Sequence, residues 1–428
     1  MTDTTAFYPP GPTNWRQSLI EIQRSPTQFL LDLQRTYGNF VHYRHGPAHC
    51  YLINEPELIR ELLVDNHTAL SRPPVMSSGI GRFLGHGLLT SSGAYHDAQR
   101  KAIQPIFTPA WIASYAQVVE SCVDELTTWQ CGQIYDLAQA MSTLTSRVIY
   151  HTLFGAEADH LTSISTAINT LQRYSGEMLR RTPKVSEADI ELAIEQLDTA
   201  VVELINLHPQ KGDATNLLSR LLAISPNGSQ TMTVQQVRDE IVTLLVAGQE
   251  TSANALTWLF YLLARNPDEE ARVRADLDNI IPELSVYSPH ASFTGWAILE
   301  ALRLYPPAWL IGRTPNEPYE IQGYTIQPGD SLVISPYVLH RTPDVFPSPD
   351  QFLPQRFQSA PPKYGFLPFG AGAHVCIGQA FAMQEIAITL RTIMKRWHFE
   401  LIDDAAVEVE PLVTLQPKSP IYMKLHKR

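Results

Sequence analysis

The sequence predicts a mainly helical protein with a smaller part that is rich in β-strands. From residue 94 to 305, the spacing of apolar residues is mainly that of helices. Beyond Pro306, prolines crowd the chain as far as Pro368, and short runs have the composition and alternation of strands. A glycine-rich loop around one cysteine follows and leads into a last helical segment. We therefore expect a single domain, 1–428, of mainly α class.

The first elements can be placed in chain order. Residues 1–15 predict a stiff lead-in, because their prolines fix φ and remove backbone donors. Residues 40–53 have the pattern of a β-hairpin, with strand-like runs around a glycine-proline turn. Proline is favoured in the first turn of a helix, so Pro56 predicts a helix that continues to about Leu63.

The later segments are defined by prolines, glycines and strand-like runs. Turns are expected within the helical region near 108–109, 209–212 and 226–228. Residues 306–375 are expected to be rich in loops and strands, residues 376–397 to be helical, and residues 398–428 to hold the C-terminal strands. The strand candidates are 319–326, 331–334, 412–415 and 421–425.

The composition is typical of a globular protein in a reducing compartment. Of the 428 residues, 44% are hydrophobic and 18% are charged, which is the balance of globular chains. Four cysteines over this length argue against a disulfide scaffold. The formal net charge of −11 argues against general nucleic-acid binding. We expect a cytoplasmic protein with no nucleic-acid partner.

Neither the first residues nor the longest apolar region predicts a membrane anchor. The first seven residues contain neither the basic nor the apolar region of a signal peptide. Residues 241–264 approach the length that spans a bilayer, but Gln249, Glu250 and Asn254 interrupt their middle, where an ionised group would be costly in lipid. We therefore expect a buried core helix and a soluble protein.

The most informative stretch is 369–378, where Cys376 lies among glycines before the last helical segment. Glycines let a backbone approach a flat partner, and a helix N-terminus has unpaired N–H groups that stabilise a thiolate. A haem iron fits this arrangement, because one cysteine thiolate can hold it. Two alternatives remain open: a lone cysteine is often only a small buried hydrophobe, and such a loop can cradle phosphate, although the Lys-Ser/Thr ending of a P-loop is missing.

An acid and an alcohol lie at the centre of the expected core helix. Burial of Glu250 without partners would be costly or would raise its pKa. Thr251 can bond back to the carbonyl of Ala247, four residues earlier, and so bend the helix. The pattern predicts a widened groove with a proton-handling pair. The alternative is a structural bend whose carboxylate is satisfied by neighbouring backbone.

Glu300 and Arg303 are three residues apart and therefore share one face of a helix. An exposed pair of this spacing contributes little to stability, so its meaning depends on its surroundings. Arg356 lies downstream in an apolar loop bounded by prolines. We expect a buried network of Glu300, Arg303 and Arg356 with a structural role, which pins this loop under the cysteine segment.

In this order, the motifs resemble those of the cytochrome P-450 superfamily of haem-thiolate monooxygenases. The superfamily's Phe-x-x-Gly-x-His/Arg-x-Cys-x-Gly signature is matched at Phe369, Gly372, His374, Cys376 and Gly378. Its oxygen-activating helix is matched at Ala247, Gly248, Glu250 and Thr251, and its Glu-x-x-Arg helix at Glu300 and Arg303. The resemblance extends from about Pro9 to Lys424. It departs slightly at Gln355, where the family often has glutamate.

The resemblance also assigns residues to the cofactor and to the substrate. His96 and Arg100 look like the basic positions of the family's haem-propionate helix, and Arg313 resembles a further propionate-binding arginine. The residues that the resemblance assigns to haem are His96, Arg100, Ala247, Arg313, Phe369, Gly370, His374, Cys376 and Gly378, with Cys376 as the iron ligand. The positions that match the substrate pocket are Leu89, Ala247, Ala308, Trp309 and Val413. Their apolar character suggests a lipophilic small molecule, although Trp309 could equally pack in the core.

The resemblance implies the cytochrome P-450 fold, a triangular helical prism around a buried haem b. Dioxygen would be the co-substrate, and Glu250 and Thr251 would deliver protons to it. Because the chain ends soon after its last strands, we expect NAD(P)H to act only through a separate ferredoxin, flavodoxin or reductase. Basic residues cluster in the sequence around the cysteine segment, and we hypothesise that they form a docking face for this partner. The alternative is ordinary solvated charge. The residues are Lys363, His374, Arg391, Lys395 and Arg396. We expect a monomer.

The motifs are compatible with three functions. The leading hypothesis is a monooxygenase that hydroxylates or epoxidises its substrate. A peroxide-driven peroxygenase or a haem-thiolate isomerase or dehydratase is the alternative, and a non-catalytic haem sensor or ligand carrier is the third. The intact pair of Glu250 and Thr251 favours oxygen activation, because the peroxygenases, isomerases and dehydratases of the family often lack this pair. The substrate stays open among fatty acids, terpenoids and polyketide-like molecules.

Overall fold

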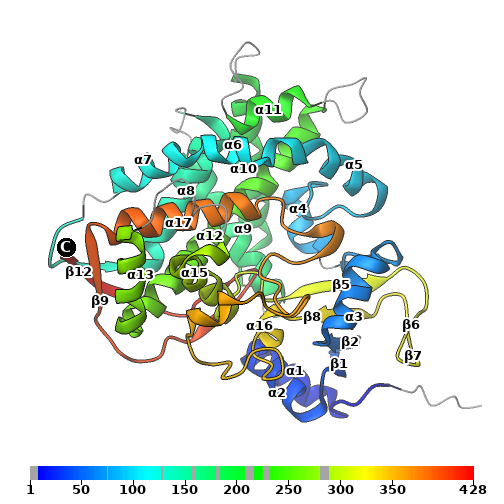
Figure 1. Cartoon of the computed structure of the whole chain (residues 1–428). Coiled ribbons are helices and arrows are strands. Elements are labelled where there is room, and N and C mark those ends of the chain that lie inside the picture. Colours follow the sequence, from blue (N-terminus) through cyan, green and yellow to red (C-terminus); the bar gives the residue numbers. More distant parts are fainter. Residues whose placement is uncertain are drawn as a thin grey trace, which may run out of the picture.

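The computed structural model describes residues 8–74, 76–126, 129–155, 161–179, 184–207, 216–224, 232–279 and 289–428. Helices fill the larger side of the molecule, and a five-stranded sheet lies on the other side beside the N-terminal helices (Figure 1). This arrangement confirms the predicted mainly α class. The expected turns near 209–212 and 226–228 lie outside the described residues.

The long helices carry most of the core, and short helical turns join them. The α-helices are α1 (Trp15–Arg24), α2 (Pro26–Tyr37), α3 (Pro56–Arg60), α4 (Gly81–Leu84), α5 (Gly93–Ile103), α6 (Pro109–Ser114), α7 (Ala116–Leu126), α8 (Leu137–Phe154), α9 (Leu161–Leu179), α10 (Glu187–Leu207), α11 (Leu217–Ala223), α12 (Val234–Arg265), α13 (Pro267–Asn279), α15 (Phe293–Leu304), α16 (Pro336–Leu339) and α17 (Gln379–Met394).

The described strands form one larger sheet and three small ones. The larger sheet has the order β1-β2-β8-β5-β3, in which only the β2–β8 pair is parallel. The smaller sheets are β4-β12-β9, β6-β7 and β10-β11. The bounds are β1 (Phe40–His45), β2 (Ala48–Ile53), β3 (Leu70–Ser71), β4 (Ile134–Asp136), β5 (Ile311–Pro315), β6 (Tyr319–Ile321), β7 (Tyr324–Ile326), β8 (Ser331–Ile334), β9 (Trp397–Leu401), β10 (Val409–Pro411), β11 (Leu415–Pro417) and β12 (Tyr422–Lys427).

Several predicted elements are confirmed and others need correction. The hairpin at 40–53 pairs in the register Phe40 with Ile53, and β8 has the predicted bounds. The single strand expected at 319–326 is instead two strands, because Gln322 and Gly323 both take positive φ and reverse the chain. The helix that begins at Pro56 ends as α-helix at Arg60 and continues as a π-turn to Asp65.

The C-terminal elements also differ in their bounds from the prediction. Residues 412–414 form the turn between β10 and β11, so the predicted strand 412–415 is wrong except for its last residue. The predicted helix 376–397 is observed as α17, which begins three residues after Cys376. Trp397 is already the first residue of β9.

Helix α12 runs through the centre of the molecule and packs against α8, α10, α15 and α17. Thr233 and Gln236 close its N-terminus with a capping box, since each side chain bonds the other residue's backbone. Gly248 packs closely against α8, because a Cβ there would lie 2.9 Å from Ile149 Cδ1 and the isoleucine side chain would have to shift. None of the described helices is long and apolar enough to cross a membrane.

Candidate active site

Cys376 lies at the end of a tight loop that leads into α17. Its backbone N–H donates to the carbonyl of Phe369 at 2.9 Å, which closes the loop. Gly372 has a φ of +70°, and a Cβ at this position would lie 1.7 Å from the carbonyl oxygen of Leu63. No other residue could occupy this position without moving the backbone. The glycine therefore lets the loop pack closely on the π-turn Glu61–Asp65.

Two groups beside Cys376 favour the thiolate form of its side chain, and burial of the sulfur opposes it. Burial raises the pKa of its thiol, and the N–H of Gly378 and the charge of Arg100 oppose that rise only in part. Gly378 is the N-cap residue of α17, and its N–H lowers the pKa of the Cys376 thiol, which is the direction that the sequence predicts for a helix N-terminus. A metal ion that replaces the proton would stabilise the thiolate further.

Five basic side chains gather beside this loop. Arg100 donates through Nη1 to the carbonyl of Val375 at 2.7 Å. Arg72 Nη2 lies 3.1 Å from His374 Nδ1, and the rings of His374 and His96 are 3.9 Å apart. Arg313 of β5 completes the group, because β3 pairs with β5 just before Arg72. The site prediction included four of these residues and missed Arg72.

The arginines of this basic cluster have no carboxylate partner among the described residues. Burial, together with Arg313, lowers the pKa of Arg72 to about 9, and burial lowers the pKa of Arg313 to about 10. None of Arg72, Arg100 and Arg313 forms an ion pair with a carboxylate in the described part of the chain, and Arg72 Nε is buried without a hydrogen-bond partner there. A group with two carboxylates would pair these cations. The propionates of haem have this chemistry, so the residues present fit the cofactor.

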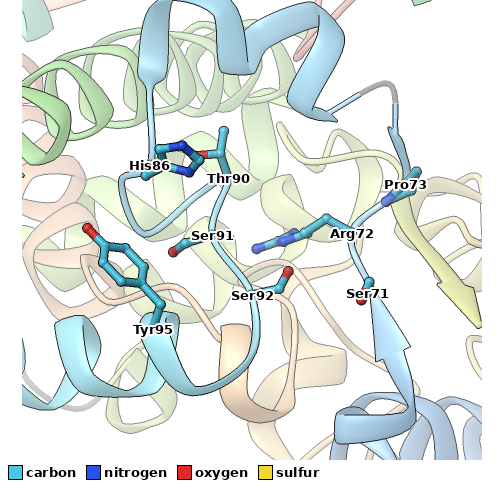
Figure 2. Close-up of a pocket in the computed structure, with 8 residues that line it drawn as sticks. All are labelled: Ser71, Arg72, Pro73, His86, Thr90, Ser91, Ser92 and Tyr95. Carbon is cyan, nitrogen blue, oxygen red and sulfur yellow. The ribbon is translucent and has the colours of Figure 1, made fainter. Parts of the chain in front are cut away.

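Arg72 also borders a cavity of about 260 Å³. Figure 2 shows its side chain extending toward Ser91 and Ser92, with Tyr95 of α5 nearby. The full lining is Ser71, Arg72, Pro73, His86, Thr90, Ser91, Ser92 and Tyr95. No sequence motif marks Arg72, and only the pairing of β3 with β5 brings it next to Arg313.

Replacement of Arg72 by leucine should weaken haem retention. The variant would lose an ionic hydrogen bond between Arg72 and a propionate of haem. We therefore expect haem to transfer to an acceptor apoprotein about tenfold faster. Arg60→Leu is the control, because Arg60 is an exposed arginine paired with Asp65. Equal transfer rates for the two variants would remove Arg72 from the cofactor site.

The acid and the alcohol of α12 are both placed by hydrogen bonds. Thr251 Oγ1 donates to the carbonyl of Ala247 at 2.5 Å, as the four-residue spacing predicts. Glu250 Oε1 accepts from Thr414 Oγ1 at 2.6 Å, while Glu250 Oε2 is buried without a partner among the described residues. Burial raises the pKa of Glu250, and the bond from Thr414 opposes that rise. Thr414 was not identified from the sequence.

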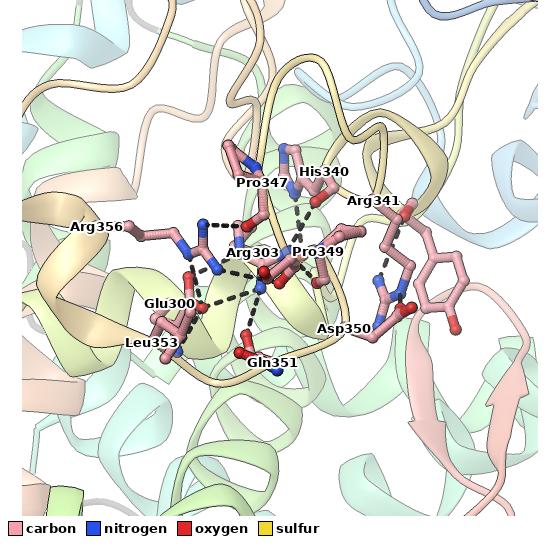
Figure 3. Close-up of polar contacts among 12 residues, drawn as sticks. Glu300, Arg303, His340, Arg341, Pro347, Pro349, Asp350, Gln351, Leu353 and Arg356 are labelled. Carbon is pink, nitrogen blue, oxygen red and sulfur yellow. Dashed lines mark hydrogen bonds and ion pairs between the residues drawn. The ribbon is translucent and has the colours of Figure 1, made fainter.

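The predicted network of Glu300, Arg303 and Arg356 is present and buried (Figure 3). Glu300 and Arg303 are both fully buried and form two hydrogen bonds, at 2.7 and 2.9 Å. Arg356 Nε donates to Glu300 Oε1 at 3.0 Å. Arg303 also donates to the carbonyls of His340, Pro349 and Gln351, so one guanidinium holds two segments of the proline-rich loop.

His340 connects this network to the cysteine loop. Its Nε2 accepts from the backbone N–H of Leu367 at 2.8 Å, so that nitrogen carries no proton. Its Nδ1 is then the donor to the carbonyl of Arg303 at 3.2 Å. Complete burial, with Arg303 close by, lowers the pKa of His340 far below the usual range, which keeps the ring neutral. The expected pinning of the loop therefore runs through His340, a residue that the prediction missed.

Comparison with known proteins identifies the family. The family model described as Cytochrome P450 matches residues 8–425. The chain belongs to the cytochrome P450 family. It is 34% identical to "Cyclooctatin synthase" of Streptomyces melanosporofaciens, over 95% of each chain. It is also 34% identical to "Cyclooctat-9-en-7-ol 5-monooxygenase" of the same organism, over 91% of this chain and 88% of the relative.

A third relative and a solved structure agree with this assignment. "Pentalenene oxygenase" of Streptomyces avermitilis is 28% identical over 95% of this chain and 94% of its own. The crystal structure of CYP175A1 from Thermus thermophillus matches with a TM-score of 0.80 and 27% identity, covering 98% of this chain and all of the other. This cytochrome P450 is therefore a haem-thiolate monooxygenase with haem b, dioxygen as co-substrate and electrons from a redox partner.

Two further acids of this cytochrome P450 are buried, one on α12 and one on α17. Burial raises the pKa of Glu385, on α17, to about 8, although a hydrogen bond with Ser252 opposes the rise. Burial also raises the pKa of Glu240 to about 8, and its Oε2 accepts from the backbone N–H of Leu88 at 3.1 Å. Neither acid was predicted from the sequence.

The loop that carries Leu89 is attached to α12 by backbone contacts. Asp239 accepts from the backbone N–H of His86 at 2.9 Å, and the next residue, Glu240, accepts from the backbone N–H of Leu88. A Cβ on Gly87 would lie 2.1 Å from Thr243 Oγ1, so the loop can pass this closely only as glycine. The loop therefore holds Leu89 at a fixed position relative to α12.

The other predicted pocket residues fall into two groups. Leu89 and Val413 are partly buried at the edge of the core, and Ala308 is exposed. Trp309 is buried in the cluster under the sheet, and its Nε1 donates to the carbonyl of Leu412 at 2.9 Å. The structure favours the core alternative for Trp309 over a pocket wall.

The residues of the hypothetical docking face are partly paired within the chain. His374 belongs to the cofactor cluster, where burial and the nearby cations hold its pKa far below the usual range. Arg391 pairs with Glu120 and Arg396 with Asp124, both on α7. Much of the expected positive charge is thus neutralised within the chain, which favours the alternative of ordinary surface charge.

Proposed function

We propose that this monooxygenase oxidises a terpenoid-like, lipophilic small molecule by inserting one oxygen atom of dioxygen, as hydroxylation or epoxidation. The observation that carries the proposal is the intact pair of Glu250 and Thr251 in the buried centre of α12. The printed names of two relatives, a cyclooctat-9-en-7-ol 5-monooxygenase and a pentalenene oxygenase, support the substrate class.

The residues of this chain would share the work as follows. Cys376 would ligate the iron of haem b, which when bound supplies the chemistry that cleaves the O–O bond. Basic side chains would pair with the propionates: Arg72, His96, Arg100, Arg313 and His374. The backbone of Phe369, Gly370 and Gly378 would shape the loop around the sulfur, and Ala247 would leave room at the centre of α12.

Proton transfer is the part that the side chains perform. Glu250 would carry a proton on its carboxyl group, because burial raises its pKa. Thr251 would pass the proton onward through Oγ1 by turning away from the carbonyl of Ala247, to which it now donates. Leu89, Val413 and Ala308 would surround the substrate and exclude water.

Further parts of the proposal concern organisation and partners. We place the protein in the cytoplasm as a monomer with one domain, and name a separate ferredoxin, flavodoxin or reductase as its electron donor. The absence of strong nucleic-acid features in the charge balance supports a small-molecule enzyme.

Replacement of Thr251 by alanine tests the proposal. The variant should keep its haem but divert reducing equivalents to peroxide, so that product formed per NAD(P)H falls by roughly a hundredfold. Thr257→Ala is the matched control, because Thr257 lies on the same helix and bonds back to Ala253 in the same way. Full coupling in Thr251→Ala would exclude Thr251 from the proton path. If the unchanged protein turns over as fast with peroxide alone as with dioxygen and NAD(P)H, a peroxygenase would be favoured.

A further inference from the structure

Thr414 lies in the turn between β10 and β11, opposite the centre of α12. Its Oγ1 donates to Glu250 Oε1 at 2.6 Å and accepts from Asn254 Nδ2 at 2.9 Å. Glu250 and Asn254 are four residues apart and therefore present their side chains on one face of the helix. One hydroxyl group thus joins the turn to two polar side chains of α12.

The turn that carries Thr414 is held on both sides by tryptophans. Trp309 Nε1 donates to the carbonyl of Leu412 at 2.9 Å, and Trp258 Nε1 donates to the carbonyl of Leu415 at 3.0 Å. The N–H of Leu415 donates to the carbonyl of Pro307 at 3.0 Å. Both indoles are buried, so these bonds are protected from water. The position of the Thr414 hydroxyl is therefore fixed by the fold.

The donor and acceptor roles in this chain of bonds can be assigned. An amide nitrogen only donates, so Thr414 Oγ1 is the acceptor from Asn254. Its single proton must then go to Glu250, which makes Glu250 Oε1 an acceptor. When Glu250 is protonated, its proton is on Oε2, the oxygen that is buried without a partner among the described residues.

Thr414 is also the only side chain that acts on the charge of Glu250 in the described part of the chain. Burial raises the pKa of Glu250, the hydroxyl of Thr414 opposes the rise, and no charged group contributes from α8, α17 or the β10–β11 turn. A hydrogen bond to a carboxylate stabilises its ionised form. Thr414 therefore governs both the orientation of the carboxyl group and its tendency to lose the proton.

We propose that Thr414 is a positioning residue for the proton-donating acid, which holds Glu250 by Oε1 and leaves Oε2 to carry the transferable proton. This inference rests on the proposed role of Glu250 in proton delivery. It also gives Trp309 a role, because its indole N–H anchors the turn instead of lining the substrate pocket.

The test replaces the hydroxyl and follows the titration of Glu250 in the haem-loaded protein. The carboxyl stretching band that disappears in Glu250→Gln identifies the acid by infrared difference spectroscopy. Thr414→Val keeps the shape of the side chain but cannot donate, so the midpoint of this band should rise by about one pH unit. If Glu250 must be protonated to act, the alkaline limb of the coupling profile should move upward by the same amount.

Two further variants separate this role from a structural one. Thr414→Ser should restore the wild-type midpoint and pH profile, because it keeps the donor. Thr152→Val, which removes a buried hydroxyl without a partner among the described residues, should leave both unchanged. An unchanged midpoint in Thr414→Val would overturn the proposal. Full coupling in Glu250→Gln would instead overturn the role of Glu250 in proton delivery. Thr414 would then have no catalytic role, even if the midpoint of the Glu250 band moves in Thr414→Val.

Discussion

Replacement of Cys376 by alanine should abolish the thiolate-type absorption spectrum of the reduced carbon monoxide complex. Alanine has no ligand atom, and the backbone bond from residue 376 to the carbonyl of Phe369 should keep the loop closed in the variant. The other cysteines are Cys50 and Cys122, both buried elsewhere in the core, and Cys131 on the surface. We also expect weaker haem retention, because the metal–ligand bond is lost.

Cys131→Ala is the matched control for this experiment. Cys131 is an exposed free cysteine whose sulfur accepts only a weak bond from the N–H of Lys427, at 3.4 Å. Its loss should leave the carbon monoxide spectrum and the haem content at the level of the unchanged protein. A thiolate-type spectrum that survives in Cys376→Ala would show that another group ligates the iron.

Local sequence patterns predicted those parts of the site that depend on neighbours along the chain. Thr251 bonds back to Ala247 because four residues make one helical turn, and the prediction needed nothing else. The pair of Glu300 and Arg303 follows from the same periodicity. The cysteine loop was predictable because its glycines mark places where the backbone must approach another segment, as Gly372 approaches Leu63.

Residues whose partners are distant in the chain escaped prediction. Thr414 contacts Glu250 across 164 residues, and Arg72 contacts His374 across 302. Neither belongs to a motif, and their closeness depends on how the β10–β11 turn and the β3–β5 pair pack. Glu385 was missed for a related reason, since its burial depends on the packing of α17 against α12.

The hypothetical docking face shows how contacts between distant segments change the meaning of charge in the sequence. Arg391 and Arg396 were counted as positive charge because the sequence places them near Cys376. Their acidic partners, Glu120 and Asp124, lie on α7, which packs against α17 in space. Charge that is read along a sequence is therefore reliable only where the facing helix is known.

Replacement of Arg303 by leucine should cost the fold much of its stability. Arg303 and Glu300 are fully buried, so removal of one partner leaves an uncompensated carboxylate and costs about 3–5 kcal/mol in the free energy of unfolding. The carbonyls of His340, Pro349 and Gln351 lose their donor at the same time. We expect a large fall in the midpoint of denaturant unfolding and a low haem content.

The chain offers a control with the same spacing. Glu269 and Arg272 are also three residues apart on a helix, but Arg272 is half exposed, so Arg272→Leu should cost only about 0.2–1 kcal/mol. Arg303→Lys keeps the charge but lacks the planar fork, and it should recover little of the loss. If Arg303→Leu unfolds at the same denaturant concentration as Arg272→Leu, the buried network does not hold the proline-rich loop. Because His340 relays this network to the N–H of Leu367, we expect the cysteine loop of Arg303→Leu to lose its protection from hydrogen exchange before the central helix α12 does.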